Sequence, residues 1–175
     1  IPVAIVGEPN VGKSTLLNFL FGCNFVTSSG RCTKGVYGTY FKVSNFNSCD
    51  GILVLDTEGL FGLLNKNEEQ QRDKFDRKLV LFCLAMSDFV LVNFKGDIDR
   101  TLTQVMMVCK DSLKNLRQGN IQTPEMFLIL NQNSQTNRET QLQDIDKMGD
   151  LGFSSENVEI LPLAFDTEKI KVSTI

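Results

Sequence analysis

The sequence has no histidine and no tryptophan, and only five of its 175 residues are cysteine. Without histidine, no imidazole is available as a catalytic base or a metal ligand. The cysteines are odd in number and form no C-x-x-C pair, which argues against a zinc knuckle or a dithiol redox motif. Few scattered cysteines fit a reducing compartment, so we expect a cytoplasmic protein, with the nucleus as a second location.

Neither sign of charge dominates, and long apolar runs are missing. The 18 Lys and Arg residues against 21 Asp and Glu residues give a net charge of -3. We therefore expect no nucleic-acid partner bound through a basic surface. No run approaches the roughly 20 apolar residues that cross a bilayer, so no membrane segment is predicted. The length and a hydrophobic content of 42% fit a single domain over residues 1–175. The sequence opens on a predicted strand and shows no predicted helix beyond residue 170. We therefore expect a fragment of a larger protein that lacks the last helix of the domain.

Predicted strands and helices alternate along the chain. Strands are expected at 1–6, 37–43, 51–56, 88–93, 126–130 and 158–161, and helices at 13–21, 69–86, 98–116 and 138–151. The second and third strands form an antiparallel hairpin. In the second helix, Phe75, Leu79, Phe82 and Met86 form the apolar stripe of a helix that packs on a core. The pattern predicts an α/β fold, a doubly wound and mostly parallel sheet whose ligands bind beyond the carboxyl ends of the strands.

Residues 7–14, GEPNVGKS, match the phosphate-loop pattern G-x-x-x-x-G-K-[ST] between a predicted strand and a predicted helix. Two glycines let consecutive backbone N–H groups point at phosphate oxygens, and the helix N-terminus faces the same anion. Lys13 supplies a positive charge for the β- and γ-phosphates, and Ser14 a hydroxyl ligand for Mg²⁺. The predicted nucleotide-binding residues of this segment are Gly7, Glu8, Pro9, Asn10, Val11, Gly12, Lys13, Ser14 and Thr15. We expect Lys13 to have no protein partner, so that removing it leaves fold stability nearly unchanged.

Two further segments complete the predicted phosphate site. Asp56 ends a buried strand and begins D-T-E-G, in which Asp56 can hold Mg²⁺ through its water shell and the Gly59 N–H can approach a γ-phosphate. Thr33 lies in a Ser- and Thr-rich loop and can ligate Mg²⁺ only when a γ-phosphate draws the loop in. Thr27 and Thr39 compete for that role.

The motifs GEPNVGKS, CTKGVY, LDTEGLFG and VNFKGDI together resemble the GTPase domain of the dynamin superfamily. The resemblance is to guanylate-binding proteins and, more closely, to interferon-inducible very large GTPases, over residues 1–165. It implies a P-loop G domain that binds GTP or GDP with Mg²⁺ and hydrolyses GTP as a molecular switch. It also implies that Thr33 is the Mg²⁺ ligand of the first switch, and that residues 66–77 follow a mobile second switch.

The sequence departs from this family pattern at the catalytic positions. Asn10 stands where guanylate-binding proteins carry an arginine finger, and Leu60 where small GTPases carry a water-orienting Gln. Hydrolysis is therefore expected to be slow unless a second copy helps across the nucleotide face, as a homodimer. Arg31 is our candidate for a finger supplied to the partner, with Lys34 as the alternative. A backbone carbonyl, Ser28 or Ser29 could orient the water. The predicted catalytic set is thus Lys13, Thr33, Gly59 and Arg31.

The predicted base-binding segment is Asn131-Gln132-Asn133, after the fifth strand. It lacks the Asp that most GTPases use to accept from guanine. Guanine selectivity is therefore expected to be weaker, or to be supplied by backbone carbonyls. Phe165 can cover the base or fill the core. Two other functions stay open: a nucleotide-binding scaffold that dimerises without significant hydrolysis, and a P-loop ATPase or kinase.

Overall fold

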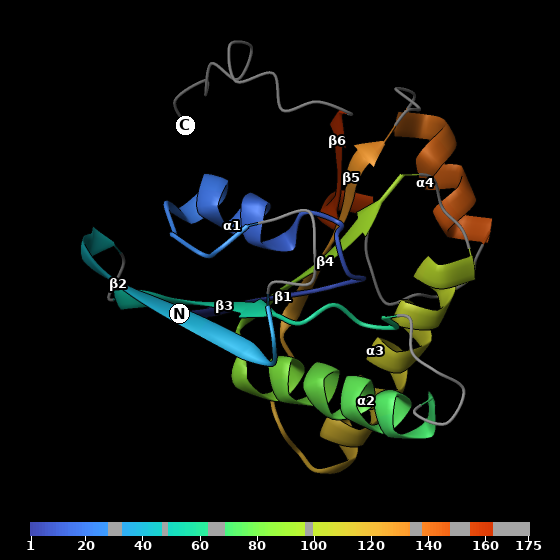
Figure 1. Ribbon diagram of the computed structural model, residues 1–175, viewed down its shortest axis with the longest axis horizontal. Helices are drawn as coiled ribbons and strands as arrows, with labels where there is room; N and C mark the ends of the chain where they lie inside the picture. Colours follow the sequence, from blue (N-terminus) through green and yellow to red (C-terminus); the bar gives the residue numbers. More distant parts are fainter. Residues whose placement is uncertain are drawn as a thin grey trace.

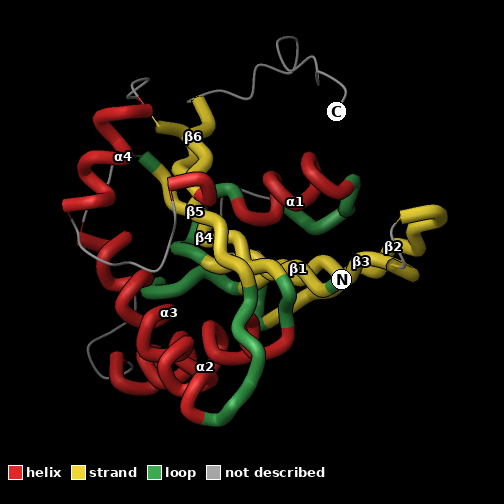
Figure 2. The backbone as a smooth tube through the Cα atoms, turned by 180° about the vertical axis from the view of Figure 1, so that it is seen from behind, coloured by secondary structure: helices red, strands yellow, loops and turns green. Residues whose placement is uncertain are grey.

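The computed structural model describes residues 1–27, 33–46, 49–62, 69–96, 100–133, 138–147 and 155–162. A six-stranded sheet forms its centre, with helices above and below (Figures 1 and 2). The strands are β1 Pro2–Val6, β2 Val36–Phe46, β3 Cys49–Thr57, β4 Phe89–Lys95, β5 Glu125–Asn133 and β6 Val158–Pro162. The helices are α1 Lys13–Phe21, α2 Glu69–Met86, α3 Arg100–Gln118 and α4 Arg138–Lys147, with a 3₁₀ turn at Ser155–Asn157.

The sheet has the order β2-β3-β1-β4-β5-β6. All neighbours pair in parallel except β2, which runs antiparallel to β3 with Val36 opposite Thr57. The predicted α/β fold and the hairpin are therefore confirmed. The hairpin is longer than predicted, because β2 continues past a register shift between Lys42 and Phe46.

Two hydrophobic cores cover the two faces of the sheet. Alternate residues of β1 serve them in turn, since successive side chains of a strand point to opposite faces. Val6 joins the larger core with Leu84 of α2, Met106 of α3 and Ile145 of α4. Ile5 joins the smaller core beneath α1. Among the described helices, α1 alone packs on that second face, as both ribbon views show (Figures 1 and 2).

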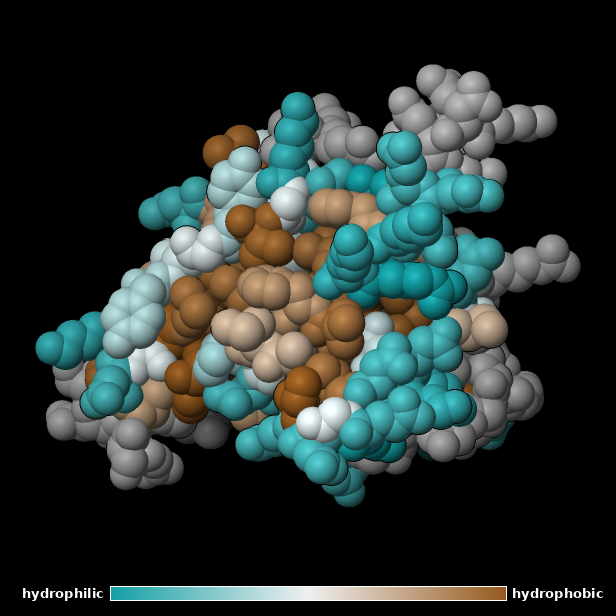
Figure 3. Space-filling view, turned by 90° about the horizontal axis from the view of Figure 1, so that it is seen from below, coloured by the Kyte–Doolittle hydropathy of each residue, from teal (hydrophilic) through white to brown (hydrophobic). Residues whose placement is uncertain are grey.

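The apolar stripe predicted for α2 is wrong in its orientation. Leu79 is buried, but Phe75, Phe82 and Met86 are 38%, 44% and 55% exposed. The helix instead turns its neighbouring face inward, with Val80, Cys83 and Leu84 in the core, and a carboxylate, Asp76, fully buried beside them. Asp76 also joins a polar cluster that is described below. On the face seen from below, where α2 lies, apolar side chains gather at the surface (Figure 3).

The carboxyl ends of β1, β3, β4 and β5 lie side by side, because these strands are parallel neighbours. The loops after β1 and β3 carry the phosphate-loop pattern and D-T-E-G, so the fold brings the predicted site segments to one edge. Within the described ranges, none of the helices combines the length and the apolar character needed to span a bilayer.

Candidate functional site

The loop after β1 approaches β4 so closely that a side chain has no room at its first residue. A Cβ on Gly7 would lie 2.0 Å from the Asn93 carbonyl oxygen of β4. At the other end, Gly12 caps α1 in the left-handed conformation, with φ 81°. The loop therefore curls over the N-terminus of α1, which begins at Lys13. This curl is the backbone geometry that suits a phosphate group.

Two buried asparagines support the loop from below. Asn93 Nδ2 donates to the Val11 carbonyl at 2.8 Å, and Asn131 Nδ2 donates to the same oxygen at 3.0 Å. Both side chains are fully buried, and their Oδ1 atoms have no hydrogen-bond partner. The structure thus places the Asn131 amide under the loop, while the predicted contact of this segment with a base stays a prediction. Asn93 is not among the predicted site residues, although a polar residue within the apolar run FVLVNF marks it in the sequence.

Lys13 is almost completely buried and, contrary to expectation, has protein partners. Its Nζ donates to the Gly7 carbonyl at 3.2 Å and to the Glu8 carbonyl at 2.7 Å. Burial lowers the pKa of its ammonium group from 10.5 to about 8, although nearby carboxylates, Asp56 first, act in the opposite direction. The site therefore holds a poorly solvated positive charge that an anion would stabilise.

The three predicted metal ligands meet at one point. Ser14 Oγ donates to Asp56 Oδ2 at 2.7 Å, and Thr33 Oγ1 donates to the same oxygen at 3.0 Å. The two hydroxyl oxygens are 3.5 Å apart. The other carboxylate oxygen, Asp56 Oδ1, is buried without a hydrogen-bond partner. Hydroxyl and carboxylate oxygens with an unused lone pair fit a hard cation such as Mg²⁺.

The protein supplies only part of such a metal site. In the part of the chain that the structure describes, no group of three or more acidic or cysteine side chains could hold a metal. Mg²⁺ commonly completes its shell with water and substrate phosphates. The residues present therefore fit a metal that arrives with a nucleotide.

Thr33 is distinguished from its two competitors by position. Thr39 lies within β2, opposite Val54, and Thr27 is exposed before the undescribed residues 28–32. Among these three threonines, as far as the structure describes their contacts, only Thr33 donates a hydrogen bond to Asp56.

Gly59 lies against the phosphate loop, as its predicted role requires. A Cβ at Gly59 would be 2.4 Å from the Cα of Pro9, so only glycine fits. The next N–H, from Leu60, donates to the Gly7 carbonyl at 2.9 Å. The Leu60 side chain is fully buried in the larger core and is not directed at the site. This burial agrees with the view that Leu60 orients no water.

The remaining predicted residues are less informative. Asn10 is exposed with a positive φ of 61°, Thr15 is exposed, and Glu8 and Pro9 are half-buried. The backbones of Gln132 and Asn133 belong to the end of β5. The predictions for their side chains, and those for Ser28, Ser29, Arg31, Phe165 and residues 66–68, lie outside what the structure describes, whereas residues 69–77 form the start of α2.

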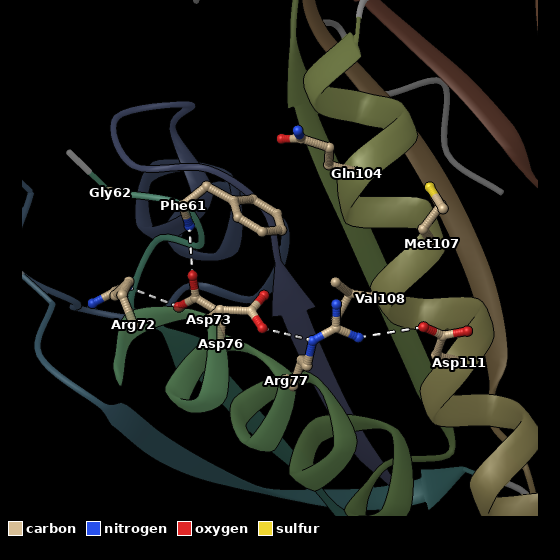
Figure 4. A pocket seen from close by; sticks show the side chains of 10 residues that line it. All are labelled: Phe61, Gly62, Arg72, Asp73, Asp76, Arg77, Gln104, Met107, Val108 and Asp111. Carbon is tan, nitrogen blue, oxygen red and sulfur yellow. Dashed lines mark hydrogen bonds and ion pairs between the residues drawn. The ribbon is translucent and has the colours of Figure 1, made fainter. Parts of the chain in front are cut away.

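A cavity of about 490 Å³ lies between α2 and α3, beside the residues that follow D-T-E-G (Figure 4). Phe61 lines it from the loop, and Val108 lines it from α3. Its charged side chains pair with one another: Arg77 bridges Asp73 at 3.0 Å and Asp111 at 3.3 Å. The cavity is separate from the phosphate loop, whose residues do not line it.

Comparison with known proteins identifies the family. A family model described as the URGCP-like GTPase domain matches residues 1–156. Interferon-induced very large GTPase 1 of Homo sapiens is 30% identical over 133 residues, which cover 74% of this chain and 5% of that protein. Protein sey1 of Talaromyces stipitatus is 38% identical over 99 residues, covering 52% of this chain and 11% of that protein. The resemblance predicted from the motifs is thus confirmed, and the chain spans a small part of these curated relatives.

Solved structures agree on the fold. Toc33 from Arabidopsis thaliana, a dimerization-deficient mutant, superposes with a TM-score of 0.61 at 18% identity, covering 95% of this chain and 72% of that one. Era, solved with MgGDPNP and a piece of 16S ribosomal RNA, gives a TM-score of 0.56 at 21% identity, covering 92% and 49%. At such identities the likeness supports the shared architecture.

Proposed function

The chain belongs to the URGCP-like GTPase domain family, and on that premise we propose that it is a switch that binds GTP with Mg²⁺ and hydrolyses it to GDP and phosphate. The observation that carries the proposal is the meeting of Ser14, Thr33 and the half-unpartnered carboxylate of Asp56 beside the phosphate loop. Because the curated relatives are far longer, the proposal concerns this domain and not the whole protein.

Each residue has a defined part in this proposal. The loop N–H groups and the α1 N-terminus bind the phosphates, and Lys13 exchanges its contacts with the Gly7 and Glu8 carbonyls for phosphate oxygens. Ser14, Thr33 and Asp56 would hold Mg²⁺, which, when bound, neutralises charge on the β- and γ-phosphate oxygens. Thr33 reports the γ-phosphate, because it is the one member of the set that lies in no helix or strand, whereas Ser14 belongs to α1 and Asp56 to β3.

Affinity measurements test the binding half of the proposal. GTP, GDP and ATP are titrated with and without Mg²⁺ against wild type and Thr33→Ala. We expect Thr33→Ala to weaken a GTP analogue with Mg²⁺ while leaving GDP nearly unchanged, since the hydroxyl acts when the γ-phosphate is present. Thr39→Ala is the matched control, because the structure places this competing threonine within β2, opposite Val54. An equal loss of affinity for both nucleotides would show that Thr33 has a structural role. Tighter binding of ATP than of GTP would favour an ATPase.

Hydrolysis is proposed to be slow in the monomer and faster in a homodimer formed across the nucleotide face. The support is indirect: Leu60 is buried in the core, and Asn10 carries no charge to neutralise the transferred phosphoryl group. A finger supplied in trans is worth roughly 10³–10⁵ in rate. We expect the rate per molecule to rise with protein concentration for wild type and to stay flat for Arg31→Ala. A rate per molecule that does not change with wild-type concentration would refute activation by dimerisation. A rise that is the same in Arg31→Ala would refute the finger role of Arg31.

The second candidate is a nucleotide-binding scaffold that dimerises with no significant hydrolysis. The same two positions favour it, because Leu60 and Asn10 leave the described site without a water-orienting or finger group of its own. Single-turnover assays at high protein concentration separate the two, since a scaffold releases no phosphate there. Membership of the very large GTPase subclass, reduced guanine selectivity and a cytoplasmic or nuclear location remain proposals from the sequence.

A further inference from the structure

Arg72, in the first turns of α2, places its guanidinium among three oxygen partners. Nη1 donates to Glu58 Oε1 at 2.6 Å, and Nη2 donates to the Gly59 carbonyl. Nε lies 2.9 Å from Asp76 Oδ1, an ion pair whose angle falls outside hydrogen-bond geometry. The guanidinium also lies over the Phe75 ring, 5.0 Å from its centre. With Arg72 12% and Asp76 0% exposed, these are contacts shielded from water and not a surface pair.

Glu58 extends this cluster to the loop that contains Thr33. Its Oε2 accepts from the Gly35 N–H at 2.9 Å, and its own N–H donates to the Gly35 carbonyl at 2.7 Å. One Glu58 oxygen thus faces Arg72 while the other holds a residue two positions after Thr33. Arg72 is therefore connected to the metal-ligand loop through a single side chain.

The peptide between Gly59 and Leu60 links the cluster to the phosphate loop. The carbonyl of this peptide, from Gly59, accepts from Arg72, and the N–H of the same peptide, from Leu60, donates to the Gly7 carbonyl. The following N–H, from Phe61, donates to Asp76 Oδ2 at 2.8 Å, as Figure 4 shows. Burial raises the pKa of the Asp76 carboxyl, and the hydrogen bond from the Phe61 N–H and the charge of Arg72 act in the opposite direction. The D-T-E-G segment is thus held between α2 and the phosphate loop.

Arg77 offers a built-in comparison on the same helix. It pairs with Asp73 and Asp111, but it is 49% exposed and contacts neither switch segment in these pairs (Figure 4). Exposed pairs of this kind contribute little to stability. A difference between Arg72 and Arg77 variants therefore reports on position and not on the loss of an arginine.

We propose that Arg72 is a positioning residue that fixes the Thr33–Gly35 and Glu58–Gly59 segments to α2, so that both respond to a γ-phosphate as one unit. The inference rests on the proposed GTPase function. It predicts that Arg72 matters for the triphosphate state and much less for the diphosphate state, because the phosphate loop itself is held separately by Asn93 and Asn131.

Hydrogen exchange without nucleotide tests the physical link. In Arg72→Gln we expect amides in residues 33–37 to exchange roughly tenfold faster than in wild type, because Glu58 loses the partner that orients it toward Gly35. Arg77→Gln should leave these amides unchanged. Unchanged exchange in Arg72→Gln would overturn the coupling, whether or not the protein binds nucleotide.

Nucleotide titrations and turnover test the functional consequence. Arg72→Gln should weaken a GTP analogue and lower kcat by roughly 10- to 100-fold, while GDP affinity changes less than about threefold. Arg72→Lys should recover part of the loss, since an ammonium can pair with Glu58 but cannot also reach Gly59 and Asp76. Arg72→Lys is also the variant on which the same measurements are made if Arg72→Gln fails to fold.

The outcomes separate the two proposals. If wild type binds no GTP analogue, the proposed function and this role both fail. If wild type binds it and Arg72→Gln weakens GDP equally, or changes neither affinity, the positioning role alone is overturned.

Discussion

Replacing Lys13 by methionine is expected to stabilise the nucleotide-free domain at pH 7. Lowering the pKa of the ammonium from 10.5 to about 8 corresponds to about 3 kcal/mol against the charged form in the folded state. Methionine removes that cost but also gives up the hydrogen bonds to the Gly7 and Glu8 carbonyls, each worth about 1 kcal/mol. The expected net gain is about 1–2 kcal/mol, in contrast to the negligible effect that the sequence alone suggested.

The pH dependence gives this prediction its sign. The folded-state pKa of Lys13 lies below its unfolded value, so the unfolded chain binds more protons between about pH 8 and 10.5. Stability of wild type therefore rises with pH in that window relative to Lys13→Met. Below about pH 8 the full cost of the charge is present. Near pH 10 most of it is gone, and wild type should be the more stable of the two, since it keeps its hydrogen bonds.

Urea unfolding of both proteins at pH 7, 8, 9 and 10, free of nucleotide and Mg²⁺, measures the difference. Comparing two variants at each pH cancels the other groups that titrate in this range. Nucleotide must be absent because a ligand bound only by folded wild type would raise its apparent stability. A less stable Lys13→Met at pH 7, or a difference that does not change between pH 8 and 10, would refute the claim that Lys13 is a strained buried charge.

Two further substitutions probe the frame of the site. Gly59→Ala forces a Cβ to within 2.4 Å of Pro9 and should lower the free energy of unfolding, measured with urea, by roughly 1–3 kcal/mol. Gly119→Ala, where a Cβ would have its nearest neighbour 3.5 Å away, should leave this free energy unchanged. Equal effects of the two substitutions would contradict the contact at Gly59. Asn93→Leu leaves the Val11 carbonyl with one donor instead of two and should weaken GDP and GTP equally, which calorimetry can check; a loss confined to GTP would place Asn93 in the switch instead.

The sequence was sufficient for the fold and for the residues at the phosphate loop. Continuous apolar runs identify strands buried on both faces, and a loop motif between strand and helix has little freedom in how it folds. Periodicity failed on α2, because the face that packs on the core carries smaller apolar side chains together with the buried Asp76, whereas Phe75, Phe82 and Met86 are exposed. No sequence pattern marks Arg72 or Asp76, and only the tertiary structure brings Arg72 between Asp76 and Glu58.

Asn93 and Asn131 reach the Val11 carbonyl from the ends of two central strands. The conformational entropy of the phosphate loop is therefore lost when the sheet folds and not when a ligand arrives. If the loop binds a phosphate group as proposed, capture requires no ordering of this loop, and we expect the association step to be fast. Under the proposed function, a slow step after capture is expected in the segments that α2 holds, so that association and commitment would occur in different parts of the same small domain.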